Sequence, residues 1–157
     1  MKPNIEIAEK NLKEIATILN NLVADEYVLY TKTRNAHWNI EGPGFMELHK
    51  FFESQYDAID LIIDEVAERV RSLGHYSLGS LKDFLSITHL TEEHNDFSKQ
   101  KLVIQSLLND HETIIRSLRK NIPLVTDKYK DAGTGDFITG IMEQHEKMSW
   151  MLRAYLG

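Results

Sequence analysis

What the sequence lacks excludes several classes of protein. It contains no cysteine, which excludes thiolate chemistry and disulfide bonds and fits a reducing compartment. No run approaches the roughly 20 apolar residues that are needed to span a bilayer. Acidic residues outnumber basic ones by 24 to 18, which argues against the basic surface of a sequence-independent nucleic-acid binder. The first residues contain acids and no apolar run, so we expect no signal or transit peptide and a cytoplasmic protein.

Residues that break helices are also scarce. Only 3 prolines and 8 glycines occur in 157 residues, and they leave long uninterrupted segments. In these segments apolar residues recur every three or four positions, which predicts four long helices. The expected helices begin at Ile5 after an Asn4 N-cap, run from Phe45 to Leu73 before a terminating Gly74, run from Asp96 to Asn121 before Pro123, and run from Thr134 to Leu156.

This pattern contains no strand alternation, so the predicted fold class is all-α. Four helices of this length predict a four-helix bundle, formed by a single domain over residues 1–157. The connection between the second and third helices is long enough to cross the bundle. A short extra helix is expected within residues 80–88 of this crossover.

The second helix carries a stripe of carboxylate and imidazole side chains. Such a stripe is ordinarily a solvated face, but this one contains no lysine, and a continuous apolar stripe flanks it. A further histidine, His37, lies in the run RNAHWNIEG at the end of the first helix. Carboxylates and imidazoles without neutralising bases suit a divalent transition metal. Within an arc of about 100° the stripe comprises His49, Glu53, Asp60, Asp64 and Glu68.

The spacing of these residues implies that two chains form the site. With a rise of 1.5 Å per residue, Glu53 and Asp64 are roughly 16 Å apart, and one ion cannot bind both. If two copies of the helix pack antiparallel about a two-fold axis near residues 58 and 59, His49 and Glu53 meet Asp64 and Glu68 of the partner subunit. The sequence contains no Glu-x-x-His motif, so a di-iron site inside one bundle is not expected.

Three segments resemble one known family. The strings KTRNAHWNIEGPGFMELHKFF, DEVAERVRSLG and SLKDFLSIT closely resemble the Dps family of mini-ferritins, and the resemblance extends to the ending MSWMLRAYLG. It implies that the four-helix bundle is ferritin-like. It also implies a hollow homo-dodecamer with tetrahedral symmetry, with the short crossover helix at the dimer interface. It also implies ferroxidase ligands His37, His49 and Glu53 from one subunit, with Asp64 and Glu68 of the partner subunit.

The resemblance implies a function as well. Fe(II) is oxidised at an intersubunit di-iron site, with hydrogen peroxide as the favoured oxidant, and ferric mineral is stored inside the shell. Two neighbouring irons deliver both electrons to peroxide together, which avoids release of hydroxyl radical and protects against oxidative damage. The position of Glu53 is more often aspartate in the family. The longer side chain either reaches a second metal directly or bridges to it through water.

Two alternative functions remain open. Members of the family that bind and condense DNA commonly use a flexible, lysine-rich N-terminal extension. The first fourteen residues here hold three lysines and three glutamates, so DNA binding is doubtful without bridging cations. An iron-free helical scaffold is the least favoured alternative, because it leaves the metal-ligand stripe without a purpose.

Acidic residues near the last helix have two interpretations. Aspartate at a helix N-terminus is ordinary capping, whereas the family places an acidic three-fold pore in this region. The candidates are Asp127, Asp131 and Asp136, of which Asp136 best matches the family's GT-x-D segment.

The remaining polar and sulfur residues carry weaker signals. Arg69 follows Glu68 and is a candidate for an orienting salt bridge. Trp38 is either a sacrificial electron donor, by resemblance, or a packing residue at the helix end. His145 is expected to be a hydrogen-bonded core or interface histidine, and the methionines are expected to fill the core or an interface. The residues without a motif are His75, His89, His94 and His111; the methionines are Met142, Met148 and Met151.

Overall fold

Four long helices and one short helix make up most of the computed structural model, which describes residues 3–92 and 96–157. Within these ranges no strand occurs. The predicted four-helix bundle with a short helix in its crossover is therefore confirmed. The elements, in order, are α1 (Glu9–Asn39), α2 (Phe45–Ser72), α3 (Leu81–Ile87), α4 (Gln100–Pro123), a π-helical turn η1 (Leu124–Lys128) and α5 (Ala132–Leu156).

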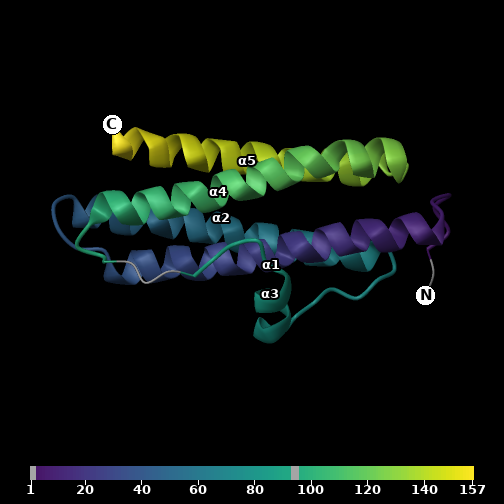
Figure 1. Ribbon diagram of the computed structural model, residues 1–157, viewed down its shortest axis with the longest axis horizontal. Helices are drawn as coiled ribbons and strands as arrows, with labels where there is room; N and C mark the ends of the chain where they lie inside the picture. The colour runs from purple at the N-terminus through teal and green to yellow at the C-terminus, as the bar shows by residue number, and fades with distance from the viewer. Residues whose placement is uncertain (1–2, 93–95) are drawn as a thin grey trace.

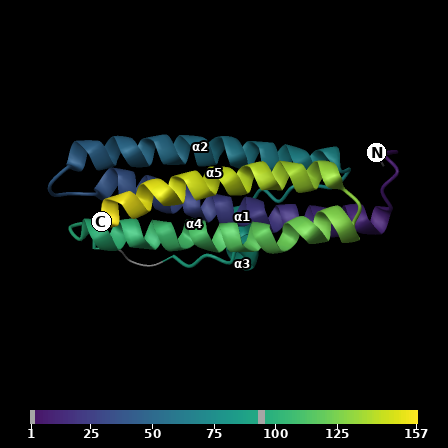
Figure 2. The same cartoon turned by 90° about the horizontal axis from the view of Figure 1, so that it is seen from above.

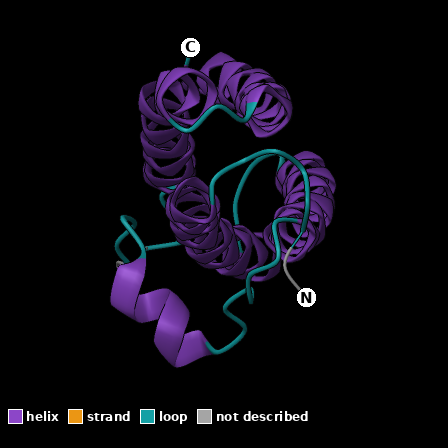
Figure 3. Ribbon diagram, turned by 90° about the vertical axis from the view of Figure 1, so that its right-hand side faces the viewer, coloured by secondary structure: helices purple, strands orange, loops and turns teal. Residues whose placement is uncertain are grey.

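The helices pair in sequence order. A tight turn folds α2 back against α1, and α5 folds back against α4 in the same way (Figure 1). The crossover, which connects the first pair to the second in sequence, returns along the bundle, so that α2 and α4 run in the same direction (Figure 2). Seen end-on, α3 lies outside the ring of four long helices, where it packs on α1 (Figure 3). Over the described ranges, no helix has both the length and the apolar character needed to cross a membrane.

One apolar core runs between the helices. It is built from the positions that recur every three or four residues, so each long helix contributes fully buried side chains. Leu19, Phe52, Leu107 and Ile138, one from each long helix, are at most 1% exposed. Burial of each such side chain stabilises the fold by about 1.5–3 kcal/mol relative to exposure.

The C-terminus of α2 confirms the role predicted for Gly74. The Gly74 amide donates to the Arg71 carbonyl at 2.9 Å, and the His75 amide donates to the Val70 carbonyl at 3.3 Å. These two bonds form a Schellman motif, which requires a left-handed residue between them. Gly74 supplies it with φ of 84°, a conformation that costs glycine little.

The predicted start of α1 was wrong. The helix begins at Glu9 with Ala8 as its N-cap, and Asn4 makes no capping bond. Glu6 has a φ of 60°, which turns the chain before the helix and interrupts the apolar spacing. Ile7 packs against the core, whereas Ile5 is 48% exposed.

The ends of α4 also differ from the prediction. Asp96 does not begin the helix but accepts a hydrogen bond from the Ser98 hydroxyl at 2.6 Å in the preceding turn. Pro123 does not stop the helical path. It lacks an N–H and clashes with a regular helix, and the next turn widens to π geometry, in which the Tyr129 amide donates to the Leu124 carbonyl at 2.9 Å.

A buried polar chain crosses the core. The side chains of Glu26, His111 and His145, from α1, α4 and α5, are each 0% exposed. Nε2 of His145 lies 2.7 Å from Oε1 of Glu26, and Nδ1 of His145 lies 2.9 Å from Nδ1 of His111. If Glu26 is ionised, it accepts from Nε2–H of His145, whose Nδ1 then accepts from Nδ1–H of His111. Burial, and secondarily the neighbouring His145, lower the pKa of His111 well below its ordinary value of 6.5.

This lowered pKa predicts a pH-dependent stability. Above about pH 6.5 His111 is neutral in both the folded and the unfolded chain. Below this pH the unfolded chain binds a proton that folded His111 does not. Stability therefore falls with decreasing pH by up to about 1.4 kcal/mol per pH unit from this group. In His111→Asn, which keeps a donor but cannot titrate, we expect a flatter decline in unfolding free energy between pH 7 and 5, measured by urea unfolding at fixed protein concentration.

The matched control is Gln105→Asn, because Gln105 is an exposed side chain on the same helix as His111 and carries no titratable group. It should keep the wild-type slope. Parallel pH profiles of unfolding free energy for the wild type and His111→Asn would contradict the prediction, because they would show that His111 titrates alike in the folded and unfolded states.

Candidate functional site

Two of the predicted ligands form a rigid imidazole pair. The rings of His37 and His49 stack with centroids 3.7 Å apart and an interplanar angle of 18°. Nδ1 of His37 lies 2.7 Å from the backbone oxygen of His49, and Nδ1 of His49 lies 2.8 Å from the backbone oxygen of His37. The turn through Gly42 and Gly44, with φ of 104° and 71°, reverses the chain and brings the two helix ends together.

These two bonds fix the tautomer of both rings. A carbonyl oxygen only accepts, so each Nδ1 must carry a hydrogen. In a neutral ring the other nitrogen, Nε2, then holds a free lone pair and is the atom available to a metal. Anchoring the remote ring nitrogen on a carbonyl is the usual way in which proteins orient a histidine ligand. The imidazole pair of His37 and His49 therefore fits divalent metal binding.

The predicted carboxylate ligands are exposed. Glu53, Asp64 and Glu68 lie along one side of α2 and face solvent, as does Asp60. His37 is 7% exposed and His49 is half-buried. Among the described residues, no three histidine, aspartate or glutamate side chains converge well enough to hold a metal ion. The chain thus brings together His37 and His49 but does not bring Asp64 or Glu68 to them.

Aromatic and basic side chains border the imidazole pair. The Tyr56 ring meets His37 edge-on with centroids 5.2 Å apart and an interplanar angle of 82°. Burial raises the pKa of the Tyr56 phenol, and the Glu53 and Asp57 carboxylates raise it further. The Arg34 guanidinium lies 4.7 Å from the centre of the Tyr56 ring. The phenol therefore stays protonated beside the candidate site.

The other histidines lie away from this site. His145 is hydrogen-bonded in the core, as predicted, and His111 joins it there. His89 binds the buried Asp25 at 2.8 Å, His75 lies 3.7 Å from Glu9, and His94 falls outside the described residues. Sequence reasoning missed Glu26 as the partner of His145. A signal existed, because Glu26 occupies a position in the apolar repeat of α1 between Leu22 and Leu29, both buried.

Comparison with known proteins identifies the family. A model of the ferritin-like domain matches residues 16–157. A DNA protection during starvation protein of Bacillus anthracis is 35% identical over 92% of this chain and 98% of its own length. The Dps protein of Vibrio cholerae superposes with a TM-score of 0.92 and 30% identity, covering 99% of this chain and 97% of that one. This chain belongs to the Dps family.

A further solved Dps structure and a further relative also match most of this chain. The Dps protein of Bacillus brevis superposes with a TM-score of 0.87 and 33% identity, over 94% of this chain and 98% of that chain. A low temperature-induced protein of Nostoc sp. is 39% identical over 98% of this chain and 86% of its own length. The Vibrio cholerae structure is described as a member of the ferritin-like diiron-carboxylate superfamily.

Burial distinguishes the three acidic residues that are candidates for a Dps pore. Asp131 is 4% exposed and caps α5, because it accepts from the Thr134 amide at 2.9 Å. It also lies 3.5 Å from Arg69, whose guanidinium donates to the Thr134 hydroxyl at 2.9 Å. Asp131 is thus a helix cap, and Arg69 ties α2 to α5 rather than pairing with Glu68. Asp127 and Asp136 are exposed and stay candidates for a pore.

The exposure of Trp38 and of the three methionines shows which of them pack in the core. Trp38 is 62% exposed, with its indole over the Arg34 guanidinium at 5.3 Å, so it does not pack at the helix end in the single chain. Met142 and Met148 are buried in the core, as expected, and Met151 is half-buried.

The unfolding free energy separates the two roles considered for Asp131 and Asp136, helix cap and exposed pore acid. Asp131→Ala removes a cap and leaves Arg69 without its carboxylate, so we expect a loss of about 1–2 kcal/mol of unfolding free energy. Asp136→Ala removes an exposed side chain and should change stability by less than about 0.5 kcal/mol. Thermal unfolding at one protein concentration measures both. Equal losses in the two variants would contradict the distinction between cap and exposed acid.

Proposed function

We propose that this Dps-family chain is a ferroxidase and an iron store, acting as a homo-oligomer in the cytoplasm. The observation that carries the proposal is the imidazole pair of His37 and His49, which offers two metal-binding nitrogens, while within residues 3–92 and 96–157 no third histidine, aspartate or glutamate converges with them to hold a metal ion. A second copy completes the site if its α2 packs antiparallel, because Asp64 and Glu68 of the partner subunit then face the pair.

Exposed apolar side chains support such pairing. Leu61 on α2 is 67% exposed, next to the carboxylate stripe, and Leu81 and Leu85 on α3 are 68% and 57% exposed. Large apolar side chains that are exposed to water are stabilised when another surface covers them. A two-fold dimer over these helices would cover them and complete two sites at once, and we propose that such dimers assemble further into a hollow dodecamer.

The proposed chemistry follows from the ligand set. Neutral imidazoles and carboxylates suit Fe(II), and the additional negative charge favours the Fe(III) product. Two Fe(II) substrates in one site reduce one hydrogen peroxide together: 2 Fe(II) + H₂O₂ + 2 H⁺ gives 2 Fe(III) + 2 H₂O. No hydroxyl radical is released in this reaction. Ferric product then accumulates as mineral inside the oligomer, and iron and peroxide are removed from solution.

Mixed oligomers test whether the site is shared between chains. His49→Ala destroys one half of every site and Asp64→Ala destroys the other half, so each variant alone should lose most peroxide-driven Fe(II) oxidation. In a dimer of the two variants, one site receives both intact halves. Unfolding and co-assembling equal amounts should therefore restore about a quarter of the sites, because half of the dimers are mixed. Stopped-flow absorbance of ferric product measures the recovery.

The control for this experiment is a mixture of His37→Ala with His49→Ala. Both changes lie in the same half-site, so no mixed dimer contains an intact site and no recovery is expected. Recovery in neither mixture, with activity retained by the single variants, would contradict an intersubunit ferroxidase site.

Protection of DNA is a second candidate function, favoured by the names of the relatives from Bacillus anthracis and Helicobacter pylori, DNA protection during starvation proteins. Each chain carries a net charge of −6, and oligomer formation multiplies its repulsion of phosphate. We therefore propose that protection proceeds by removal of iron and peroxide, which needs no contact with DNA.

A gel-shift experiment separates protection from binding. At neutral pH, near-physiological salt and no divalent cations, we expect the metal-free protein to leave plasmid DNA unshifted, because its charge is repulsive. The same protein should still prevent nicking of the plasmid by Fe(II) and peroxide. A tight complex that weakens steeply with salt would contradict this prediction and indicate a basic surface formed by assembly.

A further inference from the structure

Four aromatic rings lie in series at the candidate site. Phe45, the first residue of α2, stacks on His49 with centroids 5.2 Å apart and an interplanar angle of 30°. His49 stacks on His37 at 3.7 Å, and Tyr56 meets His37 edge-on at 5.2 Å. Phe45 is 41% exposed, and in the described part of the chain its one ring contact is with His49. The imidazole pair, rather than the apolar core, therefore accounts for the position of Phe45.

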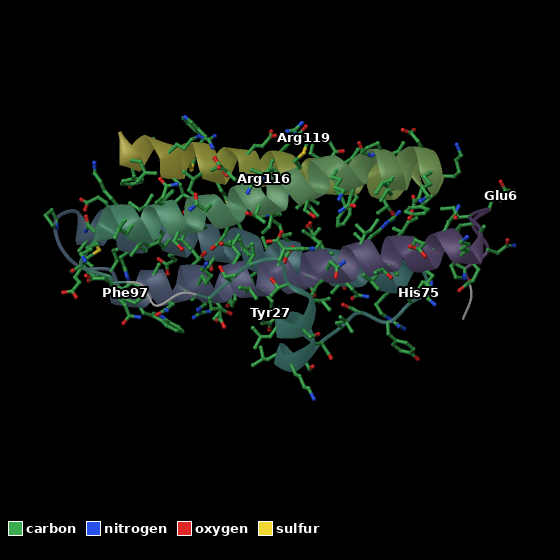
Figure 4. All side chains as sticks on the ribbon, viewed as in Figure 1. Glu6, Tyr27, His75, Phe97, Arg116 and Arg119 are labelled. Atoms are coloured by element: carbon green, nitrogen blue, oxygen red, sulfur yellow. The ribbon has the colours of Figure 1, made fainter. Side chains whose placement is uncertain are left out.

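The turn that carries Phe45 is anchored on the start of α4. Nε2 of Gln100 donates to the Glu41 carbonyl at 2.8 Å. The Glu41 amide donates to the Phe97 carbonyl at 3.4 Å, at the end of the bundle where Figure 4 labels Phe97. A shift of the first turn of α2 would break these bonds. Phe45 precedes His49 by four residues, so the two side chains share one face of the helix.

Stacking restricts the motion that hydrogen bonding leaves to His49. The bond from Nδ1 of His49 to the His37 carbonyl fixes one atom of the ring, about which the rest of the ring can still pivot. His37 stacks on one face of this ring, so Phe45, which also stacks on it, covers the other face. With both faces covered, the ring pivots only by displacing a neighbour. Nε2 of His49, the nitrogen that is free to bind metal, is therefore held in one direction.

The imidazole pair suits one ion on each ring. A metal binds an imidazole nitrogen along its lone pair, which lies in the plane of the ring. The planes of His37 and His49 are within 18° of parallel, so an ion in the plane of one ring lies outside the plane of the other. Ions in two-metal sites are roughly 3.5–4 Å apart. The ring spacing of 3.7 Å falls in this range, so an ordered stack favours two neighbouring ions.

We propose that Phe45 is a positioning residue of the ferroxidase site: its ring keeps the His49 imidazole parallel to that of His37, so that two Fe(II) substrates bind side by side. This inference rests on the proposed ferroxidase function. Phe45 carries no atom that binds iron or a proton, so it acts through His49. When the stack loosens, sites that hold one Fe(II) become more frequent. Such a site supplies one electron only: Fe(II) + H₂O₂ + H⁺ gives Fe(III) + H₂O + •OH.

Anaerobic titration of the assembled, metal-free protein with Co(II) tests the proposal without turnover. Visible absorbance counts the bound ions, and electron paramagnetic resonance detects magnetic coupling between neighbours. In the wild type we expect two Co(II) per site and a signal weakened by coupling. Phe45→Leu, which removes the ring, should bind the second Co(II) severalfold more weakly, and its uncoupled signal should grow. Phe45→Tyr keeps a stacking ring and should match the wild type.

The matched control is Phe51→Leu. Phe51 lies on the same helix, but its ring contacts Phe52 and Tyr155 rather than the imidazole pair. This variant should lose stability and keep the wild-type Co(II) coupling, which separates positioning from general packing. If Phe45→Leu does not assemble, Phe45→Met removes the ring and keeps an unbranched apolar side chain.

Peroxide reduction provides a second measurement. With two Fe(II) per site and a spin trap present, Phe45→Leu should oxidise fewer Fe(II) per peroxide than the wild type and release severalfold more trapped hydroxyl radical. Wild-type Co(II) coupling in Phe45→Leu, or an equal loss of coupling in Phe51→Leu, overturns the inference. A wild type that couples Co(II) but does not oxidise two Fe(II) per peroxide overturns the proposed function and leaves the positioning role of Phe45 intact.

Discussion

The rigidity of α2 is the constraint on which the candidate site depends. Backbone hydrogen bonds hold successive residues 1.5 Å apart along the axis, so no choice of rotamer brings Glu53 and Asp64 to one ion across roughly 16 Å. The turn at Gly42 and Gly44 brings His37 to one end of the stripe only. In the proposed site a single chain therefore carries two separate halves, and the exposed acids along α2 repel one another until something covers or neutralises them. The functional unit implied by this geometry is larger than the chain.

The orientation of the imidazole pair follows from a general property of helix ends. The last carbonyls of an α-helix have no partner in the helix, and the His37 carbonyl at the end of α1 is one of them. It accepts from Nδ1 of His49, while His37 donates to a carbonyl in the first turns of α2. The His37 carbonyl, which an isolated helix end would leave to water, thus orients His49, and a carbonyl within α2 orients His37, so no additional carboxylate is needed to fix the tautomers of these two candidate ligands.

The parts of the fold that depend on apolar spacing and on glycine could be predicted from sequence. The bounds of α2 and α5 and the short crossover helix are of this kind, whereas the placement of His37 with His49 was implied by the resemblance to the Dps family. The start of α1 and the path after Pro123 could not, because a left-handed Glu6 and a π-helical turn leave no periodic signal. Asp131 was ambiguous since a capping and a pore aspartate have the same sequence, and only burial distinguishes them. The partner half of the ferroxidase site stays a prediction.

The register of α1 links the polar core to the site. An apolar stripe with a spacing of three and four tolerates a slip of one turn, about 5.4 Å, with modest loss of packing. Polar contacts do not tolerate it: Lys32 is paired with Asp110 of α4 at 2.5 Å, and Glu26 reaches His145 of α5 at 2.7 Å. Buried polar contacts of this kind add little net stability but make wrong registers costly, because a slip leaves buried polar groups without their partners. The same helix carries His37 opposite His49 and Tyr30 opposite Tyr56, so a slip of α1 would also displace these contacts with α2 at the candidate site.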